Sequence, residues 1–93
     1  MDSEMQLQTV MTFIVVASKD PRPVTMSDLG KRLGVAQSSV TRNVQALSGT
    51  NRHGKRGHGM LHSWVDPKDR RVKLVELTPQ GRRIKVLIEA IGG

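Results

Sequence analysis

The feature that most constrains the fold is the stretch 25–47, which has the pattern of two short amphipathic helices joined by a tight turn. Ser27 is expected to cap the N-terminus of the first helix, and Gly34 to lie in the turn. The apolar residues that recur at helical spacing are Leu29 and Leu33 in the first helix and Val40, Val44 and Leu47 in the second. Two helices that each bury one stripe across a glycine-containing turn make a helix-turn-helix, which we place at 27–48.

The polar face of the second helix is the surface that this arrangement leaves outward. At about 3.6 residues per turn, it lies opposite Val40 and Val44 and carries short hydroxyls, amides and one guanidinium. Such side chains reach base edges and phosphates without filling a DNA groove. Asn43 falls beside the apolar stripe and is not expected to read a base. The candidate recognition residues are Gln37, Ser38, Ser39, Thr41, Arg42 and Gln45.

Positive charge is concentrated over the same part of the chain. The net charge is +7, and the stretch 29–65 contains no Asp or Glu. Its cationic residues are Lys31, Arg32, Arg42, Arg52, Lys55 and Arg56. A surface that carries positive charges and no carboxylates favours the binding of phosphate backbones. This part of the chain therefore indicates a nucleic-acid partner rather than a surface that is basic only for solubility.

Length and composition fix the broad class of the chain. With 93 residues there is room for one domain, 1–93, and with 2% aromatic residues its core must be aliphatic. The absence of Cys excludes disulfides and thiolate metal sites. The longest apolar run, 13–17, is too short to span a bilayer, and no signal-peptide pattern precedes it. These observations predict a cytoplasmic protein without a membrane partner.

Two further helices are expected at the ends of the chain, over 3–18 and 78–91. Thr78 followed by Pro79 is a typical helix start, with Thr as the N-cap. The faces expected to pack on the core are Leu7, Val10, Ile14 and Ala17 in the first helix and Ile84, Leu87, Ile88 and Ile91 in the last. Other apolar residues lie off these faces, which predicts a second buried surface and therefore a homodimer. The dimer candidates are Met5, Val15, Val16, Val86 and Ala90.

A loop and a β-hairpin separate the helix-turn-helix from the last helix. Residues 49–59 are rich in glycine and polar residues, which predicts a flexible loop. Its cations are Arg52, Lys55 and Arg56. We interpret them as a basic arm that follows DNA phosphates, with a solvated linker as the alternative. Strand-forming residues at 60–65 and 72–77, joined by the turn-rich stretch 66–71, predict a hairpin wing over 60–77 with a basic tip.

The order of these elements, with a short strand at 24–26, predicts an α+β winged helix-turn-helix. It should have about four helices and a two- to three-stranded antiparallel wing sheet. At this point the sequence resembles the MarR-type transcriptional regulators. The motifs that carry the resemblance are Asp-Leu-Gly-Lys-Arg-Leu-Gly-Val at 28–35, Ser-Ser-Val-Thr-Arg at 38–42, Asp-Pro-Lys-Asp-Arg-Arg at 66–71 and Leu-Thr-Pro-Gln-Gly-Arg at 77–82.

The resemblance implies homodimers on double-stranded DNA, with the recognition helix in the major groove and the wing in the minor groove. By position, Ser38, Ser39, Thr41 and Arg42 match the recognition motif, Arg71 the minor-groove arginine and Asp69 the residue that orients it. The chemistry of these residues supports the same roles. A guanidinium such as that of Arg71 suits the negative potential of a narrow minor groove. A carboxylate two positions away projects to the same side of the strand and could hold it. The wing set is Lys68, Asp69, Arg70 and Arg71.

The sequence departs from the family pattern in three places. The loop before the wing is longer than usual, Ala36 occupies a helix-cap position where an oxygen-bearing residue is expected, and the family's long C-terminal dimerisation helix is missing. The chain is thus similar to minimal winged-helix regulators of phages and viruses. Any dimer would then use the two terminal helices, and no small-molecule effector pocket is expected.

Other classes of function fit the sequence less well. His53, His58 and His62 lack neighbouring carboxylates and thiols, so no metal site or cofactor is expected. No nucleophile with a base, no paired carboxylates and no phosphate loop of known spacing is present, so an enzyme is not expected either. The alternatives to a sequence-specific regulator are a winged helix that binds proteins of the transcription machinery and a non-specific architectural DNA-binding protein.

Overall fold

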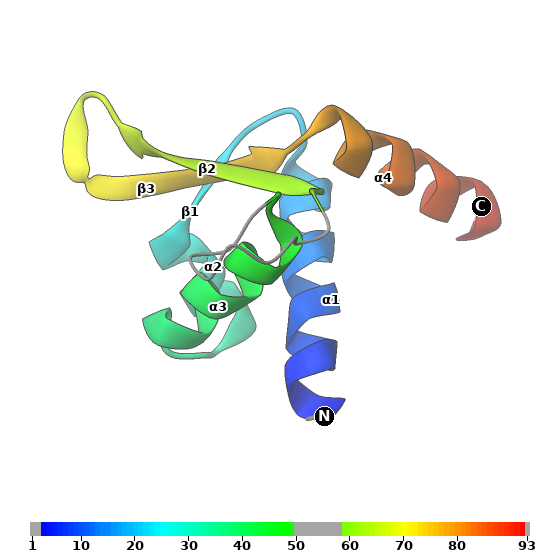
Figure 1. The fold of residues 1–93 in the computed structure, drawn as a ribbon, viewed down its shortest axis with the longest axis horizontal. Coiled ribbons are helices and arrows are strands. Elements are labelled where there is room, and N and C mark those ends of the chain that lie inside the picture. Colours follow the sequence, from blue (N-terminus) through cyan, green and yellow to red (C-terminus); the bar gives the residue numbers. More distant parts are fainter. Residues whose placement is uncertain (1–2, 50–58, 93) are drawn as a thin grey trace.

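The computed structural model describes residues 3–49 and 59–92, and side chains from Leu7 onward. Its elements are α1 (Ser3–Lys19), β1 (Val24–Thr25), α2 (Met26–Leu33), α3 (Gln37–Leu47), β2 (Leu61–Asp66), β3 (Asp69–Leu77) and α4 (Pro79–Gly92). The strands form an antiparallel sheet in the order β1-β3-β2, and β2 and β3 make its long hairpin (Figure 1). The expected fold class is confirmed for the described residues, a winged helix-turn-helix with four helices and a three-stranded sheet.

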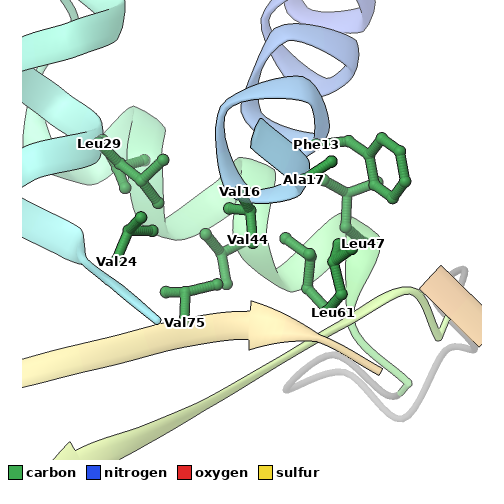
Figure 2. Packing of buried hydrophobic residues seen from close by; sticks show 11 residues of the cluster. Phe13, Val16, Ala17, Val24, Leu29, Val44, Leu47, Leu61 and Val75 are labelled. Atoms are coloured by element: carbon green, nitrogen blue, oxygen red, sulfur yellow. The ribbon is translucent and has the colours of Figure 1, made fainter. Parts of the chain in front are cut away.

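The core lies where α1, α2 and α3 meet one face of the sheet (Figure 2). Its side chains are aliphatic apart from one phenylalanine, as the composition requires. Burying each of the larger ones stabilises the fold by roughly 1.5–3 kcal/mol relative to exposure. The buried apolar residues are Phe13, Val16, Ala17, Val24, Leu29, Val40, Val44, Leu47, Leu61, Val75 and Leu77.

Helix α1 packs on the core with a different face from the one predicted. Leu7, Val10 and Ile14 were expected in the core but are 60%, 55% and 54% exposed. The buried face instead contains Val16 and Thr12, whose hydroxyl donates to a backbone carbonyl one helical turn earlier. Apolar residues occur all round α1, so their helical spacing was compatible with two different buried faces. The face that packs on the core contains Thr12, and this polar residue made it the less obvious choice. Val16 therefore belongs to the core and is not available as the dimer contact that the sequence suggested.

Helix α4 extends away from the rest of the domain soon after it begins (Figure 1). Of the face predicted to pack on the core, Ile84 does so, whereas Leu87, Ile88 and Ile91 are 58%, 50% and 88% exposed. The core contacts of α4 are confined to its first turns. The helical spacing of apolar residues in its later turns therefore does not predict which of them are buried. In the described part of the chain, no helix combines the length and the apolar character needed to cross a membrane.

The N-terminus of α2 differs by one cap residue from the prediction. Thr25, not Ser27, is the N-cap, and its Oγ1 accepts a hydrogen bond from the Asp28 N–H at 2.9 Å. Thr25 is also the last residue of β1, so the chain passes from strand to helix without a connecting residue. Thr25 and Ser27 both carry a hydroxyl suited to capping. Thr25 is the cap because its pairing with β3 holds it in an extended conformation directly before the helix.

Met60 joins three elements through its backbone. Its N–H donates to the carbonyl of Leu47, the last residue of α3, at 2.7 Å, and its own carbonyl accepts from Thr78 N–H at 3.0 Å. Thr78 Oγ1 in turn accepts from Gly81 N–H at 3.1 Å, which confirms the predicted cap of α4. Gly81 lies against the Met60 carbonyl. The end of α3, the start of the hairpin and the start of α4 are therefore held at one point.

Gly81→Ala is expected to lower the free energy of unfolding by about 1–3 kcal/mol, the usual cost of forcing extra atoms into a packed site. An added Cβ would overlap the backbone carbonyl of Met60, which cannot move aside as a flexible side chain would. Urea unfolding followed by circular dichroism measures the change. Gly92→Ala is the control, because the space around Gly92 is open and alanine favours a helix. Equal stability of the two variants would contradict the close packing.

Candidate nucleic-acid interface

The outward direction of α3 follows from its buried stripe and from the turn before it. Val40 and Val44 are 0% and 2% exposed. Gly34 adopts a left-handed conformation with φ 67°, which favours glycine, and its N–H donates to the Gly30 carbonyl at 2.8 Å. This turn closes α2 and redirects the chain into α3. The polar face of α3 consequently points away from the core, as the sequence pattern predicts.

The candidate recognition residues lie on that outward face. Gln37, Ser38, Thr41 and Arg42 are exposed, and Ser39 and Gln45 are half-buried. Thr41 Oγ1 donates to the Gln37 carbonyl at 3.0 Å, which fixes its rotamer on the helix. Within residues 3–49 and 59–92, Arg42 forms no ion pair, so its guanidinium is available to another molecule.

Asn43 does not belong to this surface. It is 1% exposed, and its Oδ1 accepts a hydrogen bond from Thr9 Oγ1 of α1 at 2.8 Å. A buried amide needs such partners, because an unpaired polar group inside the fold is costly. The position of Asn43 beside the apolar stripe thus gives it a role in docking α1 against α3.

The wing has a tighter turn than the sequence suggested. The stretch 66–71 was expected to join the strands, but β3 already begins at Asp69, which pairs with Asp66. Only Pro67 and Lys68 make the turn, and Asp66 Oδ1 accepts the Lys68 N–H at 2.9 Å. The side-chain oxygen closes this turn. The register of the hairpin then shifts, because the next pair is Val65 with Lys73, so Arg70 and Arg71 have no partner residue in β2 and lie in a bulge of β3.

Arg71 is held in place by Asp69. Its Nε lies 3.1 Å from Asp69 Oδ1 and its Nη2 lies 3.3 Å from Asp69 Oδ2. The Arg71 backbone N–H donates to the same Oδ1 at 3.1 Å. The side-chain bond from Arg71, followed by the backbone bond, lowers the pKa of the Asp69 carboxyl below its ordinary value of 3.8. The Arg71 side chain remains 90% exposed, so its guanidinium is oriented without being buried.

A groove of about 320 Å³ lies between the helix-turn-helix and the wing. It brings together predicted residues from both elements, Gln37 and Thr41 from α3 and Arg70 and Arg71 from β3. The other lining residues are Thr25, Met26, Ser27, Val72 and Lys73. Of these, Thr25, Ser27 and Lys73 are polar residues that the sequence pattern did not single out as DNA contacts. They reach the groove through the pairing of β1 with β3, which leaves no local signal in the sequence.

The remaining predicted contact residues fall into three groups. Lys68 is exposed at the turn of the wing. The loop cations Arg52, Lys55 and Arg56 lie outside the described residues. Among the dimer candidates, Val86 and Ala90 are exposed on α4, Val15 packs partly against the core, and the side chain of Met5 lies outside the described part.

The histidines do not form a recognisable metal site in the described residues. His62 pairs with Glu76, with Nε2 2.8 Å from Oε1, and stacks on Trp64 at a ring distance of 5.0 Å. Within 3–49 and 59–92, no group of three or more potential ligand side chains is placed to hold a metal ion. His53 and His58 lie outside this part of the chain.

The pKa of Asp69 should rise part of the way toward its ordinary value in Arg71→Ala, because the substitution removes the side-chain hydrogen bond, the largest cause of the lowered pKa, and keeps the backbone N–H of residue 71. A lowered folded pKa means that this carboxylate favours the folded hairpin above pH 3.8, and that its contribution is lost as the pH falls through the lowered pKa. An NMR titration of the side-chain carboxyl carbon measures both states. Arg70→Ala, which removes a neighbouring arginine without an ion pair in the described residues, should leave the Asp69 titration unchanged. The same titration in both variants would contradict the assigned cause.

Comparison with known proteins finds similarity at the level of structure. No family model matches the chain, and no curated protein matches its sequence. The transcriptional regulator BldR from Sulfolobus solfataricus is 30% identical with a TM-score of 0.65, covering 83% of this chain and 50% of that one. Bordetella bronchiseptica BpsR is 27% identical with a TM-score of 0.61, covering 87% and 56%. Streptococcus pneumoniae FabT, solved in complex with DNA, is 24% identical with a TM-score of 0.69, covering 91% and 52%.

The chain spans about half the length of these three regulators. More than four fifths of this chain is aligned in each case. The resemblance seen in the sequence is thereby confirmed: the described residues form a winged helix-turn-helix of the kind found in the MarR-type transcriptional regulators.

Proposed function

We propose that the chain is a transcriptional regulator that binds double-stranded DNA as a homodimer, with sequence specificity, on an inverted repeat. The observation that carries the proposal is the arrangement of α3 and the wing. The outward polar face of α3 and the oriented Arg71 of β3 lie on either side of one groove. A helix and a hairpin placed in this way can enter two adjacent grooves of a duplex.

Direct reading of bases is assigned to α3. A recognition helix fits the major groove, where each base pair presents a distinct pattern of donors and acceptors. Arg42 carries the five donors of a guanidinium and suits the paired acceptors of guanine. Ser38 and Thr41 are short enough to contact bases or phosphates without holding the helix away from the DNA. Together they give α3 groups for both specificity and positioning.

The wing is assigned to the minor groove. Asp69 fixes the Arg71 guanidinium before binding, so less side-chain freedom is lost when it enters a groove. A narrow minor groove has enhanced negative potential and attracts an inserted arginine. FabT, which has a similar fold, was solved in complex with DNA, and this supports DNA as the partner of this chain.

The homodimer is supported by apolar surface on the two terminal helices. Leu7, Val10 and Ile14 of α1 and Val86 and Leu87 of α4 are each at least 54% exposed. Exposed stripes of this kind on neighbouring helices are typical of association surfaces. Pairing two copies through these helices would bury the stripes and present two copies of α3 to a duplex with twofold symmetry.

Selection of bound sequences from a random duplex pool is expected to enrich an inverted repeat. Its half-sites should lie about one helical turn apart, because a symmetric dimer presents two recognition helices to one side of the duplex. Arg42→Ala and Arg71→Ala should each weaken binding to that repeat by about 1–3 kcal/mol, measured by fluorescence anisotropy at near-physiological salt.

Arg22→Ala is the matched control for both variants. Arg22 is exposed between α1 and β1, outside the groove, and its substitution removes the same charge. If the selection enriches a single half-site, DNA binding stands and the symmetric dimer fails. If nothing is enriched and binding disappears as salt rises, the chain is an architectural DNA-binding protein or a protein-binding winged helix.

Val86→Glu is expected to convert the dimer into a monomer and to weaken binding to the inverted repeat. The new carboxylate would have to be desolvated in the interface between the terminal helices, which is costly for an unpaired charge. Sedimentation equilibrium measures the mass directly. Val65→Glu makes the same change at an exposed position of the wing and should leave the mass unchanged. A wild-type chain that sediments as a monomer at all concentrations would refute the dimer.

A further inference from the structure

The groove between α2, α3 and β3 has a lining that suits an anion. Three cationic side chains, Arg70, Arg71 and Lys73, contribute to it from β3. Among the described residues that line it, none is acidic. Arg71 is paired with Asp69, whereas Lys73 forms no ion pair within residues 3–49 and 59–92. The groove therefore holds uncompensated positive charge.

Hydroxyl groups line the opposite wall. Thr25 Oγ1 accepts the Asp28 N–H, which leaves its hydroxyl proton free to donate elsewhere. Ser27 lines the groove with it and is exposed, and the hydroxyl of Ser27 makes no hydrogen bond within the part of the chain that the structure describes. Thr41 closes the wall from α3. Cations on one wall and hydroxyls on the other are the groups that bind phosphate oxygens in protein–DNA contacts.

The edge of β3 along this groove is also open. β1 is two residues long and pairs with β3 only at Leu74 and Val75. Beyond that point, the edge of β3 that faces away from β2 has no strand neighbour among the described residues. The chain turns into α2 there instead of continuing the ladder. This break in the sheet is what makes room for the groove next to Lys73.

The location of the groove identifies its occupant. The major and minor grooves of a duplex are separated by one sugar-phosphate backbone. If α3 enters the major groove and the wing enters the adjacent minor groove, that backbone must cross between them. We propose that this groove binds one phosphodiester of that backbone, with Lys73 as its principal cation and Thr25 and Ser27 as hydroxyl donors. This assignment rests on the proposed function and adds to it a contact that sets the register of the protein on the duplex.

Lys73→Met is the first test, on the full chain and the selected duplex. In the proposed homodimer the substitution removes one phosphate contact from each protomer, which should reduce the magnitude of the slope of log affinity against log salt by about 1.8. Relative to binding at 1 M salt, this corresponds to about a sixtyfold loss at 0.1 M. The loss should be the same for cognate and unrelated duplexes, because a phosphate contact carries no sequence information. Lys19→Met, at the C-terminal end of α1 and outside the groove, is the control for net charge and should leave the slope unchanged.

The second test locates the phosphate on the DNA. Each phosphate of the half-site is replaced in turn by a neutral methylphosphonate, and affinity is measured for the wild type and for Lys73→Met. One position between the α3 and wing contacts should weaken the wild type and leave the variant unaffected. If the wild type binds the duplex but Lys73→Met matches Lys19→Met, or if no position shows this coupling, the phosphate site is refuted and the proposed function stands. A wild type that does not bind duplex DNA would refute both.

Discussion

Burial of the apolar side of α3 is the interaction on which the remaining structure depends. Val40 and Val44 pack against α1 and the sheet, so the opposite side of the helix, with Arg42, must face outward. Leu47, at the end of the same stripe, is 3% exposed, and its carbonyl accepts the Met60 N–H at 2.7 Å. The packing that orients the recognition surface therefore also fixes the place where the wing begins.

The wing achieves order by a different means. Its arginine is highly exposed, and an exposed ion pair contributes little to folding stability because water and salt screen it. The pairing of Asp69 with Arg71 is better understood as orientation. A two-residue turn and a strand ladder that resumes at Lys73 flank the bulge that carries Arg71. The Asp69 carboxylate accepts hydrogen bonds from both the backbone N–H and the side chain of Arg71. The domain thus combines a helix set by burial with a hairpin set by hydrogen bonds.

Local features were predictable from the sequence, and long-range ones were not. The Gly34 turn, the Thr78 cap and the pairing of Asp69 with Arg71 each depend on residues within a few positions of one another. The packed face of α1 could not be found in this way, because apolar residues surround that helix and the choice is made by its contact with α3. Lys73 was missed for a related reason, since its groove exists only where β1 stops pairing with β3.

The close contact of Gly81 with Met60 has a mechanical consequence. Gly81 lies against the Met60 carbonyl, and the Met60 N–H donates a hydrogen bond to the end of α3, so these three backbone segments are in direct contact. Arg82 Nε, donating to Asp20 Oδ1 at 2.9 Å, ties the same turn of α4 to the end of α1. The outer turns of α4, which carry its exposed apolar residues, therefore extend from a first turn that is fixed beside the start of the hairpin. The exposed apolar part of α4 is thus anchored at the same point as the end of α3 and the start of the wing.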